Sequence, residues 1–151
     1  MNAEELKQEI LAFHPSVVFD EGGQFVNANI DAADVLTLLT ELRNRPAFDF
    51  DYMFCLTCVD YKTHFTMFYH LRSLTHRHEL VVKAKIADVN APAVDTVSHI
   101  WRTADFMERE VYDLFGVKFF RHPDLRRIFL DENWPGYPLR KNYEDPNMIE
   151  L

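Results

Sequence analysis

Glycine is scarce in this chain, with only four glycines among its 151 residues. None of them stands in the Gly-rich pattern that cradles a phosphate at the start of a helix. Serine is scarce as well, and none of the three serines lies in the strand-to-helix elbow that exposes a nucleophile. The sequence therefore gives no support for direct binding of nucleotide, flavin or nicotinamide, or for hydrolase chemistry.

Basic runs and long apolar runs are missing too. The formal net charge is −8, and the longest basic runs are the pairs Arg126-Arg127 and Arg140-Lys141. No stretch approaches the roughly 20 apolar residues of a membrane-spanning helix, and the N-terminus lacks the order of a signal peptide. We expect no nucleic-acid partner, a cytosolic or matrix-side location, and contact with a membrane only through other proteins.

Cysteine occurs only at Cys55 and Cys58, which is too few for a disulfide framework and suits a reducing compartment. The Cys-x-x-Cys spacing matches a redox dithiol or half a zinc site, but the pair lies inside a predicted strand. Residues three apart in a strand point to opposite faces, with Cα atoms roughly 10 Å apart. The histidines His76 and His78 lack accompanying carboxylates. We therefore interpret both cysteines as structural and predict no metal site.

The chain does have a large apolar and aromatic fraction, at 48% and 14% of its residues. With 151 residues, this composition supports one folded domain with a sizeable core. Several segments have apolar residues at helical spacing, and others have the composition of strands. The predicted helices are 3–13, 31–44, 93–101 and 104–115, and the predicted strands are 17–19, 25–28, 48–61, 64–74 and 79–87.

The links between these elements indicate how they pair. Gly22-Gly23 supplies the turn of a hairpin, and Asp31 is the expected N-cap of the second helix. Short links favour antiparallel pairing of the three long strands, because parallel strands need long crossovers. We predict an α+β domain over residues 1–122, with a mostly antiparallel sheet of about five strands and helices on one face. Its prolines make residues 123–151 an extended tail.

Charge and bulk are concentrated between Phe106 and Ile128. On the predicted helix, Glu110 and Asp113 lie one turn apart at the edge of an apolar stripe. This places both carboxylates beside the core. Gly116 is predicted to end the helix, because glycine adopts the left-handed conformation that closes a helix. The residues of the apolar stripe are Met107, Val111, Leu114 and Phe115.

After this helix, the aromatic pair Phe119-Phe120 and then His122-Pro123 return the chain toward it. Arg126 and Arg127 then come within reach of three helix carboxylates, Glu108, Glu110 and Asp113. Bidentate pairs between them would fix the irregular segment. An alternative is an acid/base site, but neighbouring arginines would keep its carboxylates ionised. We therefore predict a structural ion network and no catalytic residue; the acid/base alternative would use Glu110, Asp113 and His122.

This segment resembles the signature of a known family, that of the thirty-kilodalton subunit, the C subunit, of proton-pumping NADH:quinone oxidoreductase (complex I). The positions that carry the resemblance are Glu108, Arg109, Glu110, Asp113, Gly116, His122, Pro123, Asp124, Arg126 and Arg127. A later run is similar to the family's tail, at Trp134, Tyr137, Pro138, Arg140, Lys141 and Tyr143. Tyr137 stands where the family pattern leads us to expect histidine. The resemblance covers nearly the whole chain.

The resemblance implies a non-redox structural subunit of the peripheral arm, which scaffolds the quinone-reducing module. The chain itself is then expected to bind no cofactor, while the assembled complex uses FMN, iron-sulfur clusters, NADH and quinone. The implied partners are the D subunit, which carries the quinone site, and the iron-sulfur subunits B and I, with the tail as the docking segment. The complex would hold the chain at the cytoplasmic face of the inner (plasma) membrane, or on the matrix side in a mitochondrion.

Other functions remain open at this point. The homologous subunit of a membrane-bound nickel-iron hydrogenase or a related respiratory complex shares the signature and the scaffold role. A small independent enzyme would turn over alone, whereas a scaffold subunit would not. A free adaptor domain would purify without respiratory subunits. Neighbouring genes for an NADH-binding module would favour complex I over the hydrogenase.

Overall fold

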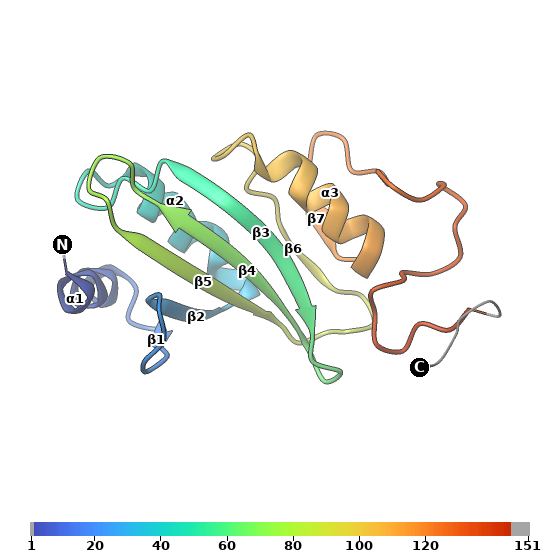
Figure 1. The fold of residues 1–151 in the computed structure, drawn as a ribbon, viewed down its shortest axis with the longest axis horizontal. Helices are drawn as coiled ribbons and strands as arrows, with labels where there is room; N and C mark the ends of the chain where they lie inside the picture. The colour runs from blue at the N-terminus through green and yellow to red at the C-terminus, as the bar shows by residue number, and fades with distance from the viewer. Residues whose placement is uncertain (1, 146–151) are drawn as a thin grey trace.

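A five-stranded sheet forms the centre of the structure, a computed structural model that describes residues 2–145 (Figure 1). The strands lie in the order β1-β2-β5-β4-β3. The predicted antiparallel pairing of the three long strands is confirmed, while β2 runs parallel to β5. The predicted α+β class is thus confirmed. The bounds are Val18–Phe19 for β1, Asn27–Asp31 for β2, Tyr52–Asp60 for β3, Phe65–Arg72 for β4 and Glu79–Ile86 for β5.

Two helices come before the long strands. The first, α1 (Ala3–Phe13), begins with a capping box formed by Asn2 and Glu5. The second, α2 (Val35–Asn44), continues a 3-10 turn that Asp31 caps, close to the predicted start. Because α2 crosses behind the sheet to its other edge, β2 and β3 run in the same direction (Figure 1). The apolar stripe of α2 is fully buried, at Val35, Leu38, Leu39 and Leu42.

The predicted helix over residues 93–101 is wrong. The structure has a short strand there, β6 (Ala93–Asp95), which pairs in parallel with β7 (Lys118–Phe120). Val94 is buried between two half-buried neighbours, which is the alternation of a strand. The partner β7 comes from beyond the next helix in the chain. A pairing so distant in sequence is invisible to local periodicity and overrides it.

The helix α3 (Ala104–Phe115) has the predicted bounds and lies against β3 (Figure 1). It ends at Gly116, whose φ of 76° is left-handed, as predicted. A side chain at this position would also collide with Tyr137, since two of its ring carbons lie 2.6 Å from where a Cβ would stand. Gly116 therefore both ends the helix and leaves room for a later segment of the chain.

The two faces of the sheet differ in burial. Side chains of β4 that face the helices, such as Met67, are fully buried, whereas those of the opposite face, such as His70, are half-buried. Cys58 pairs in register with Met67 and Cys55 with His70, so the cysteines point to opposite faces, as predicted. Burial raises the pKa of the Cys58 thiol to about 12 and also raises that of Cys55. Both are therefore poor nucleophiles at neutral pH.

The rings of His76 and His78 stack, with centroids 5.4 Å apart. Each histidine directs its Nε2 at a backbone carbonyl, that of Pro46 or Phe48. Within residues 2–145 no group of three side chains is arranged to hold a metal ion. In the same range, no helix combines the length and the apolar content that crossing a membrane requires.

Candidate functional site

Residues 123–145, the described part of the predicted tail, run back along the domain without forming a helix or strand (Figure 1). We call this segment the strap. It begins beside α3, and near its far end the amide of Lys141 donates to the buried carboxylate of Asp60, at the end of β3. The strap is therefore fastened to the domain at both ends. Residues 146–151, the end of the predicted tail, lie outside the described residues.

Asp113 is the first fastening point. It is fully buried, and its Oδ2 accepts the backbone amides of Ile128, Phe129 and Leu130 at 3.3, 2.7 and 3.2 Å. Its Oδ1 lies 3.5 Å from Nη1 of Arg127, whose side chain is only 7% exposed. One carboxylate thus organises three successive amides and one guanidinium, in the manner of an anion held by a backbone nest.

Arg127 extends this network into the rest of the strap. Its guanidinium donates to the backbone carbonyls of Asp113, Trp134 and Gly136, and it lies over the ring of Tyr137 at 4.8 Å from the centroid. The planar fork of an arginine suits several carbonyl acceptors at once. Arg127 therefore ties two separate parts of the strap to the end of α3.

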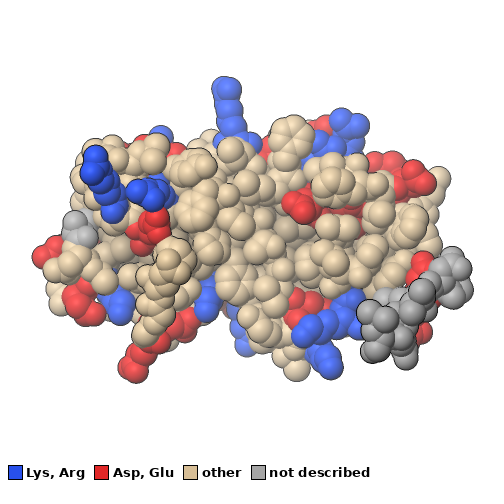
Figure 2. Space-filling model, viewed as in Figure 1, with Lys and Arg blue, Asp and Glu red and all other residues tan. Residues whose placement is uncertain are grey.

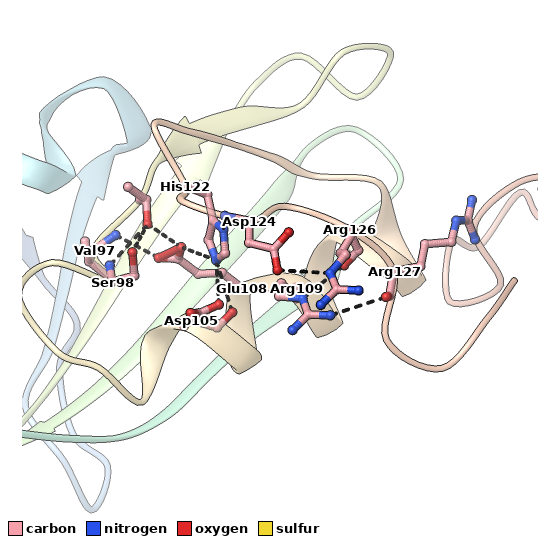
Figure 3. Close-up of polar contacts among 10 residues, drawn as sticks. Val97, Ser98, Asp105, Glu108, Arg109, His122, Asp124, Arg126 and Arg127 are labelled. Atoms are coloured by element: carbon pink, nitrogen blue, oxygen red, sulfur yellow. Dashed lines mark hydrogen bonds and ion pairs between the residues drawn. The ribbon is translucent and has the colours of Figure 1, made fainter. Parts of the chain in front are cut away.

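The other two arginines of the signature have different roles. Arg109 donates to the carbonyls of Arg126 and Arg127, at 3.2 and 3.5 Å (Figure 3). Arg126 is exposed and pairs with the equally exposed Asp124. The prediction of a pair with a helix carboxylate is correct for Arg127 but wrong for Arg126. Neighbouring residues of an extended segment point to opposite sides, so only one of the two can face α3.

Glu108 forms a second buried site, and within the described residues no arginine pairs with it. Its Oε1 accepts the amide of Val97 at 2.7 Å, and its Oε2 accepts the hydroxyl of Thr96 at 2.6 Å (Figure 3). Burial raises the pKa of Glu108 from an ordinary 4.5 to about 7, although both hydrogen bonds oppose the shift. The prediction that Arg126 and Arg127 come within reach of a helix carboxylate is therefore wrong for Glu108, whose hydrogen bonds come from Thr96 and Val97.

His122 connects α3 with the start of the strap. Its side chain is fully buried, and its Nδ1 accepts the amide of Asp124 at 3.0 Å, which places the ring proton on Nε2. Nε2 faces Asp105, at 3.2 Å from the backbone oxygen and 3.1 Å from Oδ1 (Figure 3). The same nitrogen lies 4.0 Å from Oε2 of Glu108. His122 therefore brings the Glu108 site and the strap together.

The three residues of the acid/base alternative do not converge on a common cleft. Glu110 is exposed and forms no ion pair among the described residues, so the prediction that it lies beside the core in the ion network is wrong. Asp113, in contrast, is enclosed by strap amides. His122 faces a third side chain, Asp105. Paired-carboxylate catalysis needs two carboxyl groups around one substrate position. The arrangement instead uses buried charge to hold backbone amides.

Several residues of these networks were not singled out from the sequence, among them Thr96 and Asp60. Thr96 could not have been found, because it approaches Glu108 only through the unexpected strand β6. Asp60 could have been found from the local sequence, because an aspartate at the start of a turn commonly accepts the amide two residues later in an Asx-turn. In the structure its Oδ1 accepts the amide of Lys62 in this way. Its second bond, to the amide of Lys141, depends on the strap and has no counterpart in the local sequence.

Most of the predicted docking residues also have contacts inside the chain. Tyr137 lies between the guanidiniums of Arg127 and Arg140, and the hydroxyl of Tyr143 donates to Asp145. Pro138 is half-buried and Lys141 is exposed. Trp134 is 36% exposed. The two tyrosines of the strap therefore contact other parts of the chain, while the large apolar side chains that remain exposed on the strap are Phe129, Trp134 and Leu139.

Fold and site together define an α+β domain in which a charged helix, α3, fastens the extended strap that follows it. The model of one protein family, described as respiratory-chain NADH dehydrogenase, 30 Kd subunit, matches residues 28–147. The chain belongs to this family. The resemblance carried by the segment from Glu108 to Ile128 is thereby confirmed.

Two relatives illustrate the similarity. The C subunit of NADH-quinone oxidoreductase from Chloroherpeton thalassium is 41% identical over 122 residues, which cover 80% of this chain and 50% of that protein. The C/D subunit of NADH-quinone oxidoreductase from Phocaeicola vulgatus is 40% identical over 105 residues, covering 69% and 20%. The chain thus spans about half or less of the length of these relatives.

Among solved structures, a chain in the membrane-bound sulfane sulfur reductase, an archaeal respiratory membrane complex, has the same fold. The TM-score is 0.79 with 25% sequence identity, and the match covers 93% of this chain and 85% of that one.

Proposed function

We propose that this chain is a non-redox structural subunit of the peripheral arm of a proton-translocating NADH:quinone oxidoreductase, where it scaffolds the quinone-reducing module and docks to the D subunit, which carries the quinone site. The family membership carries this proposal. In the Phocaeicola vulgatus relative, whose name joins the letters of the C and D subunits, the match covers only 20% of the protein. A C-like part joined to a D-like part in one chain supports direct contact between the two.

The buried networks support a scaffold function over a catalytic one. The carboxylates of Glu108 and Asp113 are both fully buried and already accept hydrogen bonds from the chain itself. Groups held in this way fix geometry and are closed to a substrate. In this proposal the complex's FMN, iron-sulfur clusters, NADH and quinone are bound by other subunits, with the iron-sulfur subunits B and I nearby. The chain would sit peripherally, on the cytoplasmic or matrix side of the membrane.

The docking surface we propose consists of the exposed apolar side chains of the strap and of the outer side of α3. Phe106 on α3 is 66% exposed, Phe129 is 67% exposed and Leu139 is 51% exposed. Interfaces depend mainly on a few large side chains that become buried on binding. Phe106 is held by the helix, and Asp113 and Arg127 fix the strap segment that carries Phe129. The domain therefore presents a prepared surface, and little entropy is lost on docking.

Affinity purification of the full chain from gently solubilised membranes tests the assignment. Recovery of the quinone-site subunit, the iron-sulfur subunits and the NADH-binding subunits, together with NADH:quinone activity, is the expected result. A chain that purifies alone would contradict the scaffold function. A chain that turns over a substrate by itself would point to the enzyme alternative.

The docking surface makes a quantitative prediction. Phe129→Ala and Leu139→Ala should each weaken binding to the D subunit by roughly tenfold, because each removes a large anchor, and should leave the domain folded because both side chains face solvent. The affinity is measured on the surface-immobilised D subunit. Leu74→Ala is the matched control, since Leu74 is 60% exposed in the β4–β5 turn, away from the strap. Equal affinities of all three variants would contradict the proposed surface.

A second candidate is the homologous subunit of a membrane-bound nickel-iron hydrogenase or a related respiratory complex. The structural similarity to a chain of the membrane-bound sulfane sulfur reductase favours this candidate. It shows that the fold also occurs in a respiratory membrane complex that is not named as an NADH:quinone oxidoreductase. The same purification separates the candidates. Hydrogenase subunits in place of NADH-binding subunits would select this second function.

A further inference from the structure

A pocket of about 280 Å³ lies where the β3–β4 turn meets the end of the strap. Three cationic side chains line it, from two segments that are far apart in the sequence. They are Lys62 in the turn and Arg140 and Lys141 in the strap. Figure 2 shows Lys and Arg side chains gathered around this end of the molecule. Such a cluster contrasts with the net charge of −8 of the whole chain.

Arg140 is held rigidly with its terminal nitrogens unused. Its Nε donates to the carbonyl of Phe115 at 2.6 Å, and its guanidinium lies over the rings of Phe65 and Tyr137, at 5.4 and 4.9 Å from their centroids. Among the described residues, neither terminal nitrogen donates a hydrogen bond. By contrast, the terminal nitrogens of Arg127 donate to three carbonyls. Arg140 thus offers several preorganised donors at the wall of the pocket.

The single carboxylate of the pocket, Asp60, does not neutralise these cations. Its Oδ1 accepts the amide of Lys62 at 2.7 Å, and its Oδ2 accepts the amide of Lys141 at 2.9 Å. Within residues 2–145, neither lysine side chain forms an ion pair. Three cations against one carboxylate leave a positive excess. Asp60 instead fixes both backbone segments, and so positions the two lysines on either side of the pocket.

The remaining lining defines the kind of ligand. Asn90 and Asn142 add side-chain amides that can donate to oxygen, while Phe65 and Val89 form an apolar wall. At about 280 Å³, the pocket falls just below the roughly 300–1,000 Å³ of sites for drug-sized ligands. The donors come from several directions and outnumber the two oxygens of a carboxylate. This arrangement matches a tetrahedral anion.

We infer that this pocket binds a phosphate group, either free or carried by a small molecule or lipid headgroup. Arg140, Lys62 and Lys141 supply the charge, and the ligand bridges the β3–β4 turn and the strap. Binding therefore also fastens the end of the strap more firmly. Two of its cations lie in the strap, but none of the three belongs to the exposed apolar surface proposed above for docking.

Titration of the 151-residue chain with inorganic phosphate at constant ionic strength tests the site by NMR. The amide signals of Lys62, Asn90 and Lys141 should shift together and saturate, and hydrogen exchange near the end of the strap should slow. Arg140→Gln and Lys62→Gln should each weaken binding by roughly tenfold, because each removes a charge-assisted donor. Arg102→Gln removes one exposed positive charge elsewhere and should bind like the unmodified chain.

Arg140→Gln could weaken phosphate binding by loosening the strap. Lys62→Gln controls for this effect, because it removes a cation and keeps the hydrogen bond from the backbone amide of residue 62 to Asp60. Vesicles of phosphatidylglycerol distinguish the sources of the phosphate. Binding to vesicles that depends on Lys62 indicates a lipid headgroup, and binding of soluble phosphate alone indicates a free anion. The inference is overturned if phosphate gives no saturable shift, or if Lys62→Gln and Arg140→Gln bind phosphate as tightly as Arg102→Gln.

Discussion

Replacing Asp113 with alanine is expected to release the first part of the strap and to lower the free energy of unfolding by about 3–5 kcal/mol. The substitution removes the acceptor of three successive amides, those of Ile128, Phe129 and Leu130. It also leaves the nearly buried guanidinium of Arg127 without its carboxylate. An uncompensated buried charge is among the most destabilising changes that a single substitution can make.

Two measurements check this expectation. Urea unfolding gives the change in stability, and hydrogen exchange gives its location, because the three amides should lose protection in the Asp113→Ala variant. Asp124→Ala is the matched control. Its carboxylate pairs with Arg126 on the surface, where such a pair contributes about 0–1 kcal/mol. Similar losses for the two aspartates would show that Asp113 does not hold the strap.

The contrast between Arg126 and Arg127 shows what the sequence could and could not predict about the site. Charge type and spacing were enough to predict that an arginine after His122-Pro123 reaches a carboxylate of α3, and Arg127 does so at Asp113. Which of two adjacent arginines faces the helix depends on the path of an irregular segment. That path is set by side chains of the whole strap, so no local pattern encodes it.

The fold, like the site, has parts that the local sequence predicts and parts that it does not. The helices α2 and α3 were predictable because each has its own apolar stripe and its own end signals, Asp31 before α2 and Gly116 after α3. The strand β6 was not, because its structure depends on pairing with β7, far along the chain. The error at residues 93–101 also hid the surroundings of Glu108, since Thr96 and Val97 follow β6 directly.

The pocket formed by Lys62, Arg140 and Lys141 extends this point to surface charge. The pair Arg140-Lys141 is visible in the sequence, but that Lys62 lies beside it is not, because Lys62 is almost eighty residues earlier in the chain. The chain places them together because Asp60 accepts one amide from each segment. The positive potential of this pocket therefore depends on the fold as well as on the local sequence.

Glu108 gives the second large effect, a loss of stability as pH rises. Burial raises its pKa from 4.5 to about 7 in the folded chain. Between these two values the folded state binds more protons than the unfolded state, so the free energy of unfolding falls with increasing pH. The contribution is fully present below pH 4.5 and is lost as pH rises to about 7, and the shift corresponds to about 3 kcal/mol.

Glu108→Gln should remove this dependence. The glutamine carbonyl can still accept the amide of Val97, and its amide can donate to Thr96, so the packing is preserved. Urea unfolding should give nearly equal free energies of unfolding for the variant and the unmodified chain at pH 4.5. At pH 8 the free energy of unfolding of the variant should be higher by about 3 kcal/mol. Glu110→Gln, on the exposed side of the same helix, should show no such trend. A constant difference between the Glu108→Gln variant and the unmodified chain over this range would mean that Glu108 is ionised throughout, held by the amide of Val97 and the hydroxyl of Thr96 despite its burial.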